Sequence, residues 1–324
     1  MRLSAELLDA IQRETDQVDR RKLVQATAQL SEHYNAGNFS TPAIASEALR
    51  AAYLAVRMPA TYAAIRRVFA EINLRAPQSE ISSLLDIGAG PGTALLAAGE
   101  EFPHLQHATL VEADANWIAV GKRLAEQSES PVVQQAQWIK QDLRSGLSCE
   151  KHEMVVISYT LGELPQPAAE AVLNKAWKSA SKFLVLVEPG TRRGFAAINV
   201  ARSFLIANAA TIVAPCPHHC ACPLAAAGDW CHFSQRVERT SQHRQLKGGE
   251  LGYEDEKFSY IVASKTDSPS VEARIVRHPR KHSGHVQLVL CTAEGKIENR
   301  TVTRSRKEAY KRVRKTEWGD SWIE

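Results

Sequence analysis

The sequence has few of the features that would assign it to a class at once. Among 324 residues it has six cysteines and 6% aromatic residues, no internal repeat and no low-complexity tract. No stretch reaches the roughly 18 uncharged apolar residues of a membrane span. Because 44% of the residues are hydrophobic, we expect a soluble protein with one large domain plus attachments, or with two domains, and no membrane partner.

Targeting signals are also missing from the first residues. The segment MRLSAELLDAIQRETD carries too many acids for a transit peptide and lacks the apolar core of a signal peptide. We therefore expect a cytoplasmic location. Since thiols stay reduced in that compartment, the cysteines are not expected to form a disulfide framework.

The dinucleotide fingerprint G-x-G-x-x-G is absent, but a related glycine loop is present. The residues from Leu84 to Ala97, LLDIGAGPGTALLA, predict a strand, a tight loop and a helix. Glycines spaced two apart let the backbone turn sharply and approach a ligand. Pro91 removes an N–H from the loop, so the expected ligand of this nucleotide-type pocket is not a phosphate.

The loop resembles the first motif of class I S-adenosylmethionine (SAM) methyltransferases, an acidic residue followed by G-x-G-x-G. The matching residues are Asp86, Gly88, Gly90 and Gly92. The resemblance implies that SAM is the cofactor. It also implies that Glu112, or Asp114 in its place, binds the ribose hydroxyls, and that Asp142 contacts adenine.

Near-continuous apolar runs predict the parallel strands of an α/β fold, a doubly wound sheet covered on both faces. The runs are SSLLDIG, HATLVEA, QWIKQDL, EMVVISYT and KFLVLVEP. We expect three parts: an N-terminal helical region at 1–75, a SAM-methyltransferase-like (Rossmann-like) domain at 76–265, and C-terminal strands with a basic tail at 266–324. Because a further strand is expected only at FSYIVAS, residues 211–250 are interpreted as a cysteine-rich insertion.

Four of the six cysteines lie within sixteen residues, at positions 216, 220, 222 and 231. No C-x₂-C knuckle typical of structural zinc is present. Cys216 and Cys222 each precede a proline, and Cys291 supplies a distant thiol. This spacing favours an iron–sulfur cubane held by four cysteines, whereas His218, His219 and His232 leave zinc as the alternative.

A narrower resemblance covers nearly the whole chain. The order of glycine loop, A-P-C-P-H-x₃-C-P, D-W-C-H-F-S-Q-R and a late L-C-T is similar to the methyltransferase-like assembly factors of the mitochondrial small ribosomal subunit and their bacterial relatives. The resemblance implies a [4Fe–4S] cluster on Cys216, Cys222, Cys231 and Cys291. Cys220 is extra, so either it or Cys222 is the ligand. The implied partners are the small ribosomal subunit and its rRNA, not DNA.

The loop after the fourth strand contains no catalytic signature. It lacks the [DNS]-P-P-[YFW] of amino-group methyltransferases and the nucleophilic cysteine of cytosine-C5 enzymes. Tyr159 is a candidate to stack on a base and Glu163 a candidate general base; alternatively, both only shape the pocket floor. Two functions follow from the resemblance: an rRNA methyltransferase, or an assembly factor that binds SAM and RNA without turnover.

The C-terminal segment from Arg300 to Lys315 holds eight Lys or Arg residues against one acid, Glu308. Such a surplus indicates an anionic partner, although a solvated helix face is the alternative. An uncharged metabolite would not need it. The segment therefore disfavours a third function, a small-molecule methyltransferase.

Overall fold

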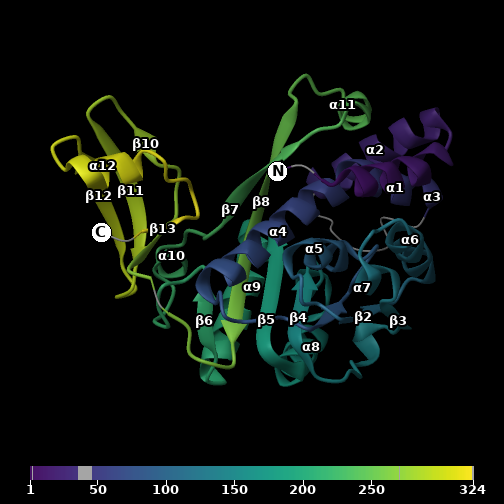
Figure 1. Cartoon of the computed structure of the whole chain (residues 1–324), viewed down its shortest axis with the longest axis horizontal. Coiled ribbons are helices and arrows are strands. Elements are labelled where there is room, and N and C mark those ends of the chain that lie inside the picture. The colour runs from purple at the N-terminus through teal and green to yellow at the C-terminus, as the bar shows by residue number, and fades with distance from the viewer. Residues whose placement is uncertain (2, 36–45, 270, 323–324) are drawn as a thin grey trace. The chain divides into compact units, whose positions relative to one another are not determined.

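The computed structural model describes residues 1, 3–35, 46–269 and 271–322, and Figure 1 shows its elements. Two compact units make up the chain, each assembled from separate segments. The first unit comprises residues 1–70, 80–181 and 235–256, and the second comprises 71–79, 182–234 and 257–324. The three consecutive parts expected from the sequence remain a prediction, and part of the first, 36–45, lies outside the described residues.

Amphipathic helices begin the first unit, as their spacing predicts. Ser4 caps α1 by accepting from the Leu7 N–H, and Leu7 and Ile11 form its buried face. Leucines of α2 pack on small residues of α3. Pro59 lies in the first turn of α4, where a helix does not need the missing N–H. The bounds are α1 Ala5–Asp16, α2 Arg20–Asn35, α3 Glu47–Val56 and α4 Met58–Arg75.

The strands of the first unit pair in parallel in the order β3-β2-β1-β4. The largely buried and apolar sequences of β1, β2 and β4 suit a sheet that helices cover, whereas the edge strand β3 is only partly buried. After β3 the chain crosses to the other side of β1, so the carboxyl ends of β1 and β4 form the switch point at which such sheets bind ligands. The bounds are β1 Ser83–Ile87, α5 Thr93–Glu101, β2 His107–Glu112, α6 Ala115–Glu126, α7 Pro131–Gln134, β3 Gln137–Lys140, β4 His152–Ser158, α8 Gln166–Ser179 and α11 Ser241–Lys247.

In the second unit β8 lies between β5 and β6 and runs antiparallel to both. The expected strand FSYIVAS is confirmed as part of β8. One expectation is wrong: residues 211–214, assigned to the insertion, form β6, so the insertion begins only after Ala214. The bounds are β5 Ala180–Pro189, α9 Arg192–Ala207, β6 Thr211–Ala214, α10 Pro223–Ala226, β7 Phe233–Glu238 and β8 Tyr253–Ser264. Residues 180–181 of β5, 235–238 of β7 and 253–256 of β8 belong to the first unit.

The C-terminal part of the second unit is a small antiparallel sheet around β11. A hairpin turn lies at Ser283 and Gly284, where the His282 N–H donates to the His285 carbonyl at 2.9 Å. Helix α12 packs Tyr310 and Val313 onto the core of this sheet. The bounds are β9 Ala273–Ile275, β10 Arg280–Lys281, β11 His285–Thr292, β12 Ile297–Thr303, α12 Lys307–Val313 and β13 Ser321–Trp322.

The strand orders within the two units are those of the class I SAM-methyltransferase fold, so the predicted α/β fold class is confirmed. In the described parts of the chain, no helix is both long and apolar enough to cross a membrane.

Candidate functional site

The glycine loop links β1 to α5 in the first unit. Gly88, Gly90 and Gly92 have φ angles of 72°, 54° and 81°, a left-handed conformation that L side chains rarely adopt. A Cβ at Gly88 would lie 2.4 Å from the Thr160 side chain, whereas a Cβ at Gly90 would meet no atom within 4 Å. The space over Gly90 is therefore open to a ligand.

Asp86 lies directly before this loop, at the end of β1. Its side chain is fully buried, and neither carboxyl oxygen has a hydrogen-bond partner among the described residues. Burial, and then the charge of Glu112, raise the pKa of this carboxyl to about 8. A cation that approaches Asp86 would favour the charged form of this carboxyl and lower its pKa.

Glu112 ends β2 and faces the same loop. Its carboxylate accepts hydrogen bonds from the backbone N–H groups of Gly90 at 2.8 Å, Ala113 at 2.8 Å and Asp114 at 2.9 Å. Burial raises the pKa of Glu112, although these bonds oppose the shift. The alternative residue, Asp114, accepts from the Asn116 N–H as the cap of α6.

Asp142 follows β3, but its carboxylate is already paired. It accepts from the Arg144 guanidinium at 2.7 Å and from the Arg144 backbone N–H at 2.9 Å. The hydrogen bonds from Arg144 lower the pKa of Asp142. Sequence reasoning missed Trp138 on β3, whose ring lies 3.2 Å from the Cβ position of Gly92 and 2.3 Å from that of Gly121. The sequence signal for this contact was Gly121, a glycine inside helix α6, because its missing Cβ leaves room for a large neighbouring ring.

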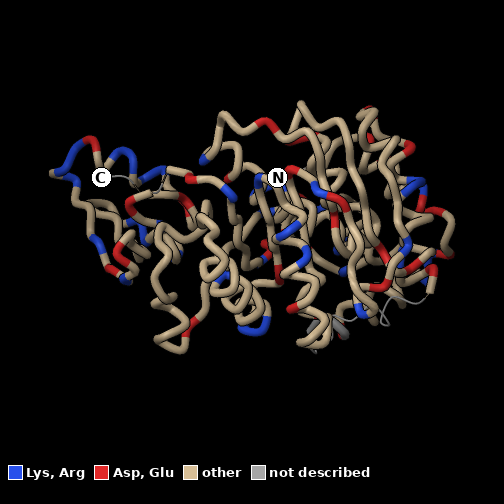
Figure 2. The backbone as a smooth tube through the Cα atoms, turned by 90° about the horizontal axis from the view of Figure 1, so that it is seen from below, with Lys and Arg blue, Asp and Glu red and all other residues tan. Residues whose placement is uncertain are grey.

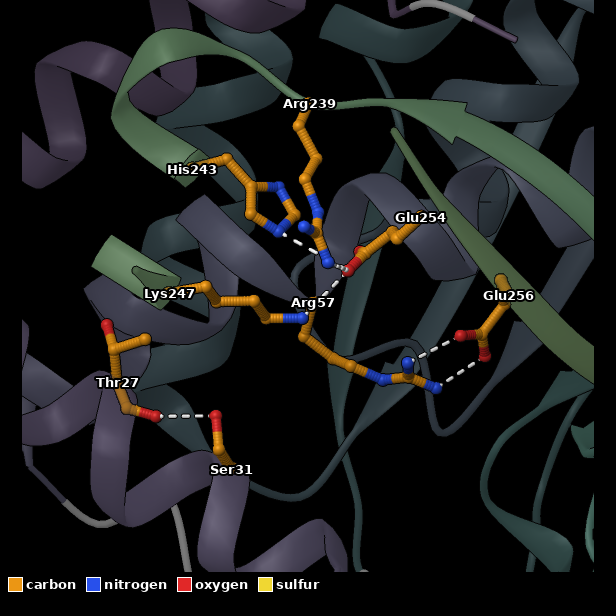
Figure 3. Close-up of polar contacts among 8 residues, drawn as sticks. All are labelled: Thr27, Ser31, Arg57, Arg239, His243, Lys247, Glu254 and Glu256. Atoms are coloured by element: carbon orange, nitrogen blue, oxygen red, sulfur yellow. Dashed lines mark hydrogen bonds and ion pairs between the residues drawn. The ribbon is translucent and has the colours of Figure 1, made fainter. Parts of the chain in front are cut away.

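Tyr159 follows β4 and is held in a polar cluster. Its hydroxyl donates to a carboxylate oxygen of Glu256 at 3.1 Å. The same carboxylate accepts two bonds from Arg57, at 2.6 and 2.5 Å (Figure 3). Burial, and then the Glu256 charge, raise the pKa of Tyr159 well above its usual range. The other catalytic candidate, Glu163, is half-buried in the short 3₁₀ turn Leu161–Glu163.

Glu254 lies two residues before Glu256, and both carboxylates belong to β8. Figure 3 shows Glu254 contacted by Arg239, His243 and Lys247, at 3.1, 3.5 and 2.9 Å. Burial acts to raise the pKa of Glu254, but the hydrogen bond from His243 and the Lys247 charge hold it well below its usual range. The sequence offered no signal for Glu254 or Glu256, because neither belongs to a recognisable motif.

Four cysteines line one cavity in the second unit: Cys216, Cys222, Cys231 and Cys291. They come from the loop between β6 and β7 and from β11. Cys220 is exposed and does not line the cavity. Burial raises the pKa of the Cys291 thiol to about 12, with a contribution from the charges of Cys216 and Cys222. The structure thus brings together the four thiols that the sequence selected.

The three histidines near these cysteines have different surroundings. His218 lines the cavity, with its Nε2 atom 3.3 Å from the Cys291 Sγ. His219 accepts from the Ile212 N–H at 2.9 Å, and His232 packs between the rings of Trp230 and Trp318. Among the described residues, no group of three or more His, Cys, Asp or Glu side chains is arranged so that it could hold a metal ion.

Comparison with known families identifies the chain. A family model described as mitochondrial small ribosomal subunit Rsm22 matches residues 47–323. The chain belongs to this family. The resemblance drawn from the glycine loop and the cysteine motifs is therefore confirmed.

Curated relatives agree with the family assignment. Human METTL17, a mitochondrial ribosome assembly protein, is 27% identical over 297 residues, which cover 85% of this chain and 62% of the human protein. An Rsm22-cox11 tandem protein of Schizosaccharomyces pombe, also mitochondrial, is 27% identical over 83% of this chain and 42% of its own length. The chain thus spans less than two thirds of either relative.

Two solved methyltransferases are also similar to the chain. Magnesium protoporphyrin IX methyltransferase from Synechocystis PCC 6803, with bound SAM, is 14% identical and has a TM-score of 0.42, over 64% of this chain and 80% of that one. Precorrin-6y C5,15-methyltransferase from Geobacter metallireducens is 15% identical with a TM-score of 0.41, over 62% of this chain and 88% of that one.

The expected cytoplasmic location is corrected by these comparisons, because the family and its relatives are described as mitochondrial. The expectation rested on the acids of the first sixteen residues. These residues include the folded helix α1, in which Glu14 forms an ion pair with Arg123. Glu14 therefore serves the folded unit, so its charge is no argument for a cytoplasmic location.

Proposed function

We propose that this chain binds SAM at the glycine loop and acts on the small ribosomal subunit during its assembly. The observation that carries SAM binding is the buried Asp86 carboxyl, whose two oxygens lack donors, beside the open space over Gly90. The ribosomal role is supported by the relatives, which are described as ribosome assembly proteins.

The residues of the loop fit the chemistry of SAM. Its methionine end carries an ammonium group and its sulfonium a second positive charge, and both are favoured beside carboxylates. Asp86 would hold the methionine end and Glu112 the ribose, with Gly88, Gly90 and Gly92 allowing close approach of the backbone. Asp142 is the candidate for adenine, provided that it releases Arg144.

Bound SAM would supply a methyl group that is already activated on sulfur, so the chain's contribution would be placement. Before Tyr159 could stack on a base, its hydroxyl would have to leave Glu256, and the Arg57 guanidinium, 5.7 Å from the ring centroid, would have to leave the ring face. These contacts favour the second candidate function, an assembly factor that binds SAM without methyl transfer. Tyr159 and Glu163 stay candidates for the catalytic function.

The four-cysteine cavity is proposed to hold a [4Fe–4S] cluster. A cubane spreads four thiolate ligands around a body several ångströms across and is commonly bound by four cysteines. Cys222 is preferred over Cys220 because it lines the cavity with the other three. Zinc is the alternative, for which His218 is the histidine that lines the cavity.

The basic surface of the C-terminal sheet is proposed to contact rRNA. Figure 2 shows Lys and Arg positions gathered in the part of the chain near the C-terminus. Arg304, Lys311, Arg312 and Arg314 are all exposed, as phosphate contacts require. Such contacts position a protein without reading sequence.

Methyl transfer separates the two functions. Purified small ribosomal subunits are incubated with labelled SAM and either the parent chain or Asp86→Ala. Label in the rRNA that depends on Asp86 supports the enzyme. Subunit binding without label supports the assembly factor, and a chain that binds neither SAM nor subunits contradicts the proposal.

A further inference from the structure

Arg202 is a buried cation without an acidic partner in the described residues. It lies on α9 with 4% of its surface exposed. Its Nη2 donates to the carbonyls of His218 and Cys220, both at 2.8 Å, and its Nε has no hydrogen-bond partner in the same residues. Arg274, which is 1% exposed, has the Glu71 carboxylate at 2.9 Å. Arg202 has no such carboxylate.

A guanidinium without a counter-charge is costly to bury. It is retained where another group of the site supplies negative charge. Arg202 lines the same cavity as the four cysteines, and no carboxylate is among the described residues that line it. Thiolates on this cavity are therefore the available counter-charge for Arg202.

His218 connects Arg202 to one of these thiols. The His218 Nδ1 atom lies 3.4 Å from the Arg202 Nη2. A guanidinium has donors and no acceptor, so Nδ1 accepts and the ring proton resides on Nε2. That Nε2–H is then the donor to the Cys291 Sγ at 3.3 Å.

We propose that Arg202 is a positioning residue that supplies the counter-charge of an anionic four-thiolate site and acts on Cys291 through His218. The inference rests on the proposed cysteine-bound cofactor. Arg202 also holds the loop that carries Cys216 and Cys222 in place, through the carbonyls of His218 and Cys220. The charge of Arg202 is expected to stabilise the site that holds the anionic cofactor and to destabilise the cofactor-free site, where it lacks a counter-charge.

The test compares full-length Arg202→Met, Arg202→Lys and the control Asn199→Ala, which changes an uncharged residue of the same cavity. Each chain is reconstituted anaerobically with ferrous iron and sulfide. We expect the cluster of Arg202→Met to be lost to a chelator at least about tenfold faster than that of the parent, because hydrogen bonds to charged groups have this magnitude. Arg202→Lys should retain an intermediate lifetime and Asn199→Ala the parental one.

Unfolding of the cluster-free chains distinguishes a counter-charge from a structural residue. Without the cofactor, Arg202→Met should unfold at the parental temperature or above it, because a buried unpaired charge has been removed. If Arg202 only bound carbonyls, the empty variant would unfold at a lower temperature, and the proposal would be overturned.

His218→Phe tests the connection to Cys291 even if the Arg202 variants fold poorly. Hydrogen bonds to cluster sulfurs are among the factors that set reduction potentials. Losing the Nε2–H donor should therefore make one-electron reduction by dithionite less favourable by about tenfold, which is about 59 mV for a one-electron couple. An unchanged potential would overturn the role of His218.

The two levels of the proposal fail differently. A parent chain that takes up neither iron nor zinc overturns the cysteine site and this inference together. A parent chain that loads, with an Arg202→Met variant that loads and keeps its cluster equally well, overturns this inference alone.

Discussion

The Asp86 carboxyl is buried at the end of β1, and its two oxygens lack donors within the described residues. Its pKa rises from 3.8 to about 8 on folding, chiefly through burial. Between these two values the folded chain holds a proton that the unfolded chain has released. The free energy of unfolding of the SAM-free protein should therefore fall as pH rises through this window.

Asp86→Asn should remove most of this pH dependence, because an amide does not titrate. Thermal unfolding of parent and variant from pH 5 to pH 8 measures the difference. We expect the two curves to diverge with rising pH, the variant being the more stable at pH 8. Parallel curves would show that Asp86 is charged in the folded protein.

Gly90→Arg should abolish SAM binding while the chain stays folded. A Cβ there meets no protein atom within 4 Å, and a left-handed residue other than glycine costs about 1–2 kcal/mol. The long side chain would fill the space proposed for the ligand. Calorimetric titration with SAM measures the loss, and circular dichroism checks the fold; parental affinity would contradict the site.

The loop between β6 and β7 carries three of the four cavity cysteines and the exposed Cys220. Cys222→Ser should lose the cluster, whereas the matched Cys220→Ser should keep it, because only the first removes a thiol from the cavity. Iron and sulfide analysis of both chains, together with the visible absorption, measures this. The reverse outcome would assign Cys220 as the ligand.

The basic residues of α12, of the turn before it and of its C-cap provide a second prediction for these elements. Changing Arg304, Lys311, Arg312 and Arg314 to Glu should weaken rRNA binding equally across sequences. If four phosphate contacts are lost, the slope of log affinity against log salt should flatten by about 3 to 4.

A control with the same charge change reverses four basic residues of the first unit that are also exposed: Arg21, Lys22, Lys122 and Lys178. It should leave the slope unchanged. Equal effects of the two sets would mean that net charge, rather than the C-terminal surface, governs binding.

At the scale of the whole molecule, the candidate SAM residues all lie in the first unit and the cavity cysteines all lie in the second. Cys231→Ser should therefore lose the cluster and leave the affinity for SAM within about twofold of the parental value, since sites that share no residues or partners act almost independently. Calorimetry on the cluster-free variant tests this, and a large loss of affinity would reveal energetic coupling between the two units.

Several features followed from the sequence because their causes are local. Apolar runs specify buried parallel strands, and alternating glycines specify the left-handed loop at 88–92. The helical spacing of the apolar residues Leu7 and Ile11 specifies the buried face of α1. The cysteine motif likewise selected the four thiols that share a cavity. These patterns span a few residues each, so neighbouring side chains alone reveal them.

The α/β class and the family could thus be inferred from the sequence alone, which also supplied the candidate ligands of both sites. Tertiary structure decided which partners those residues have, because the partners lie far along the chain. Arg57 is 199 positions from Glu256, and Arg202 reaches Cys291 through His218. Strand β6 also depends on the tertiary structure, because its four residues form a strand by pairing with β8. Contacts between residues so far apart in sequence depend on the packing of the whole chain, which the local periodicity of apolar residues does not encode.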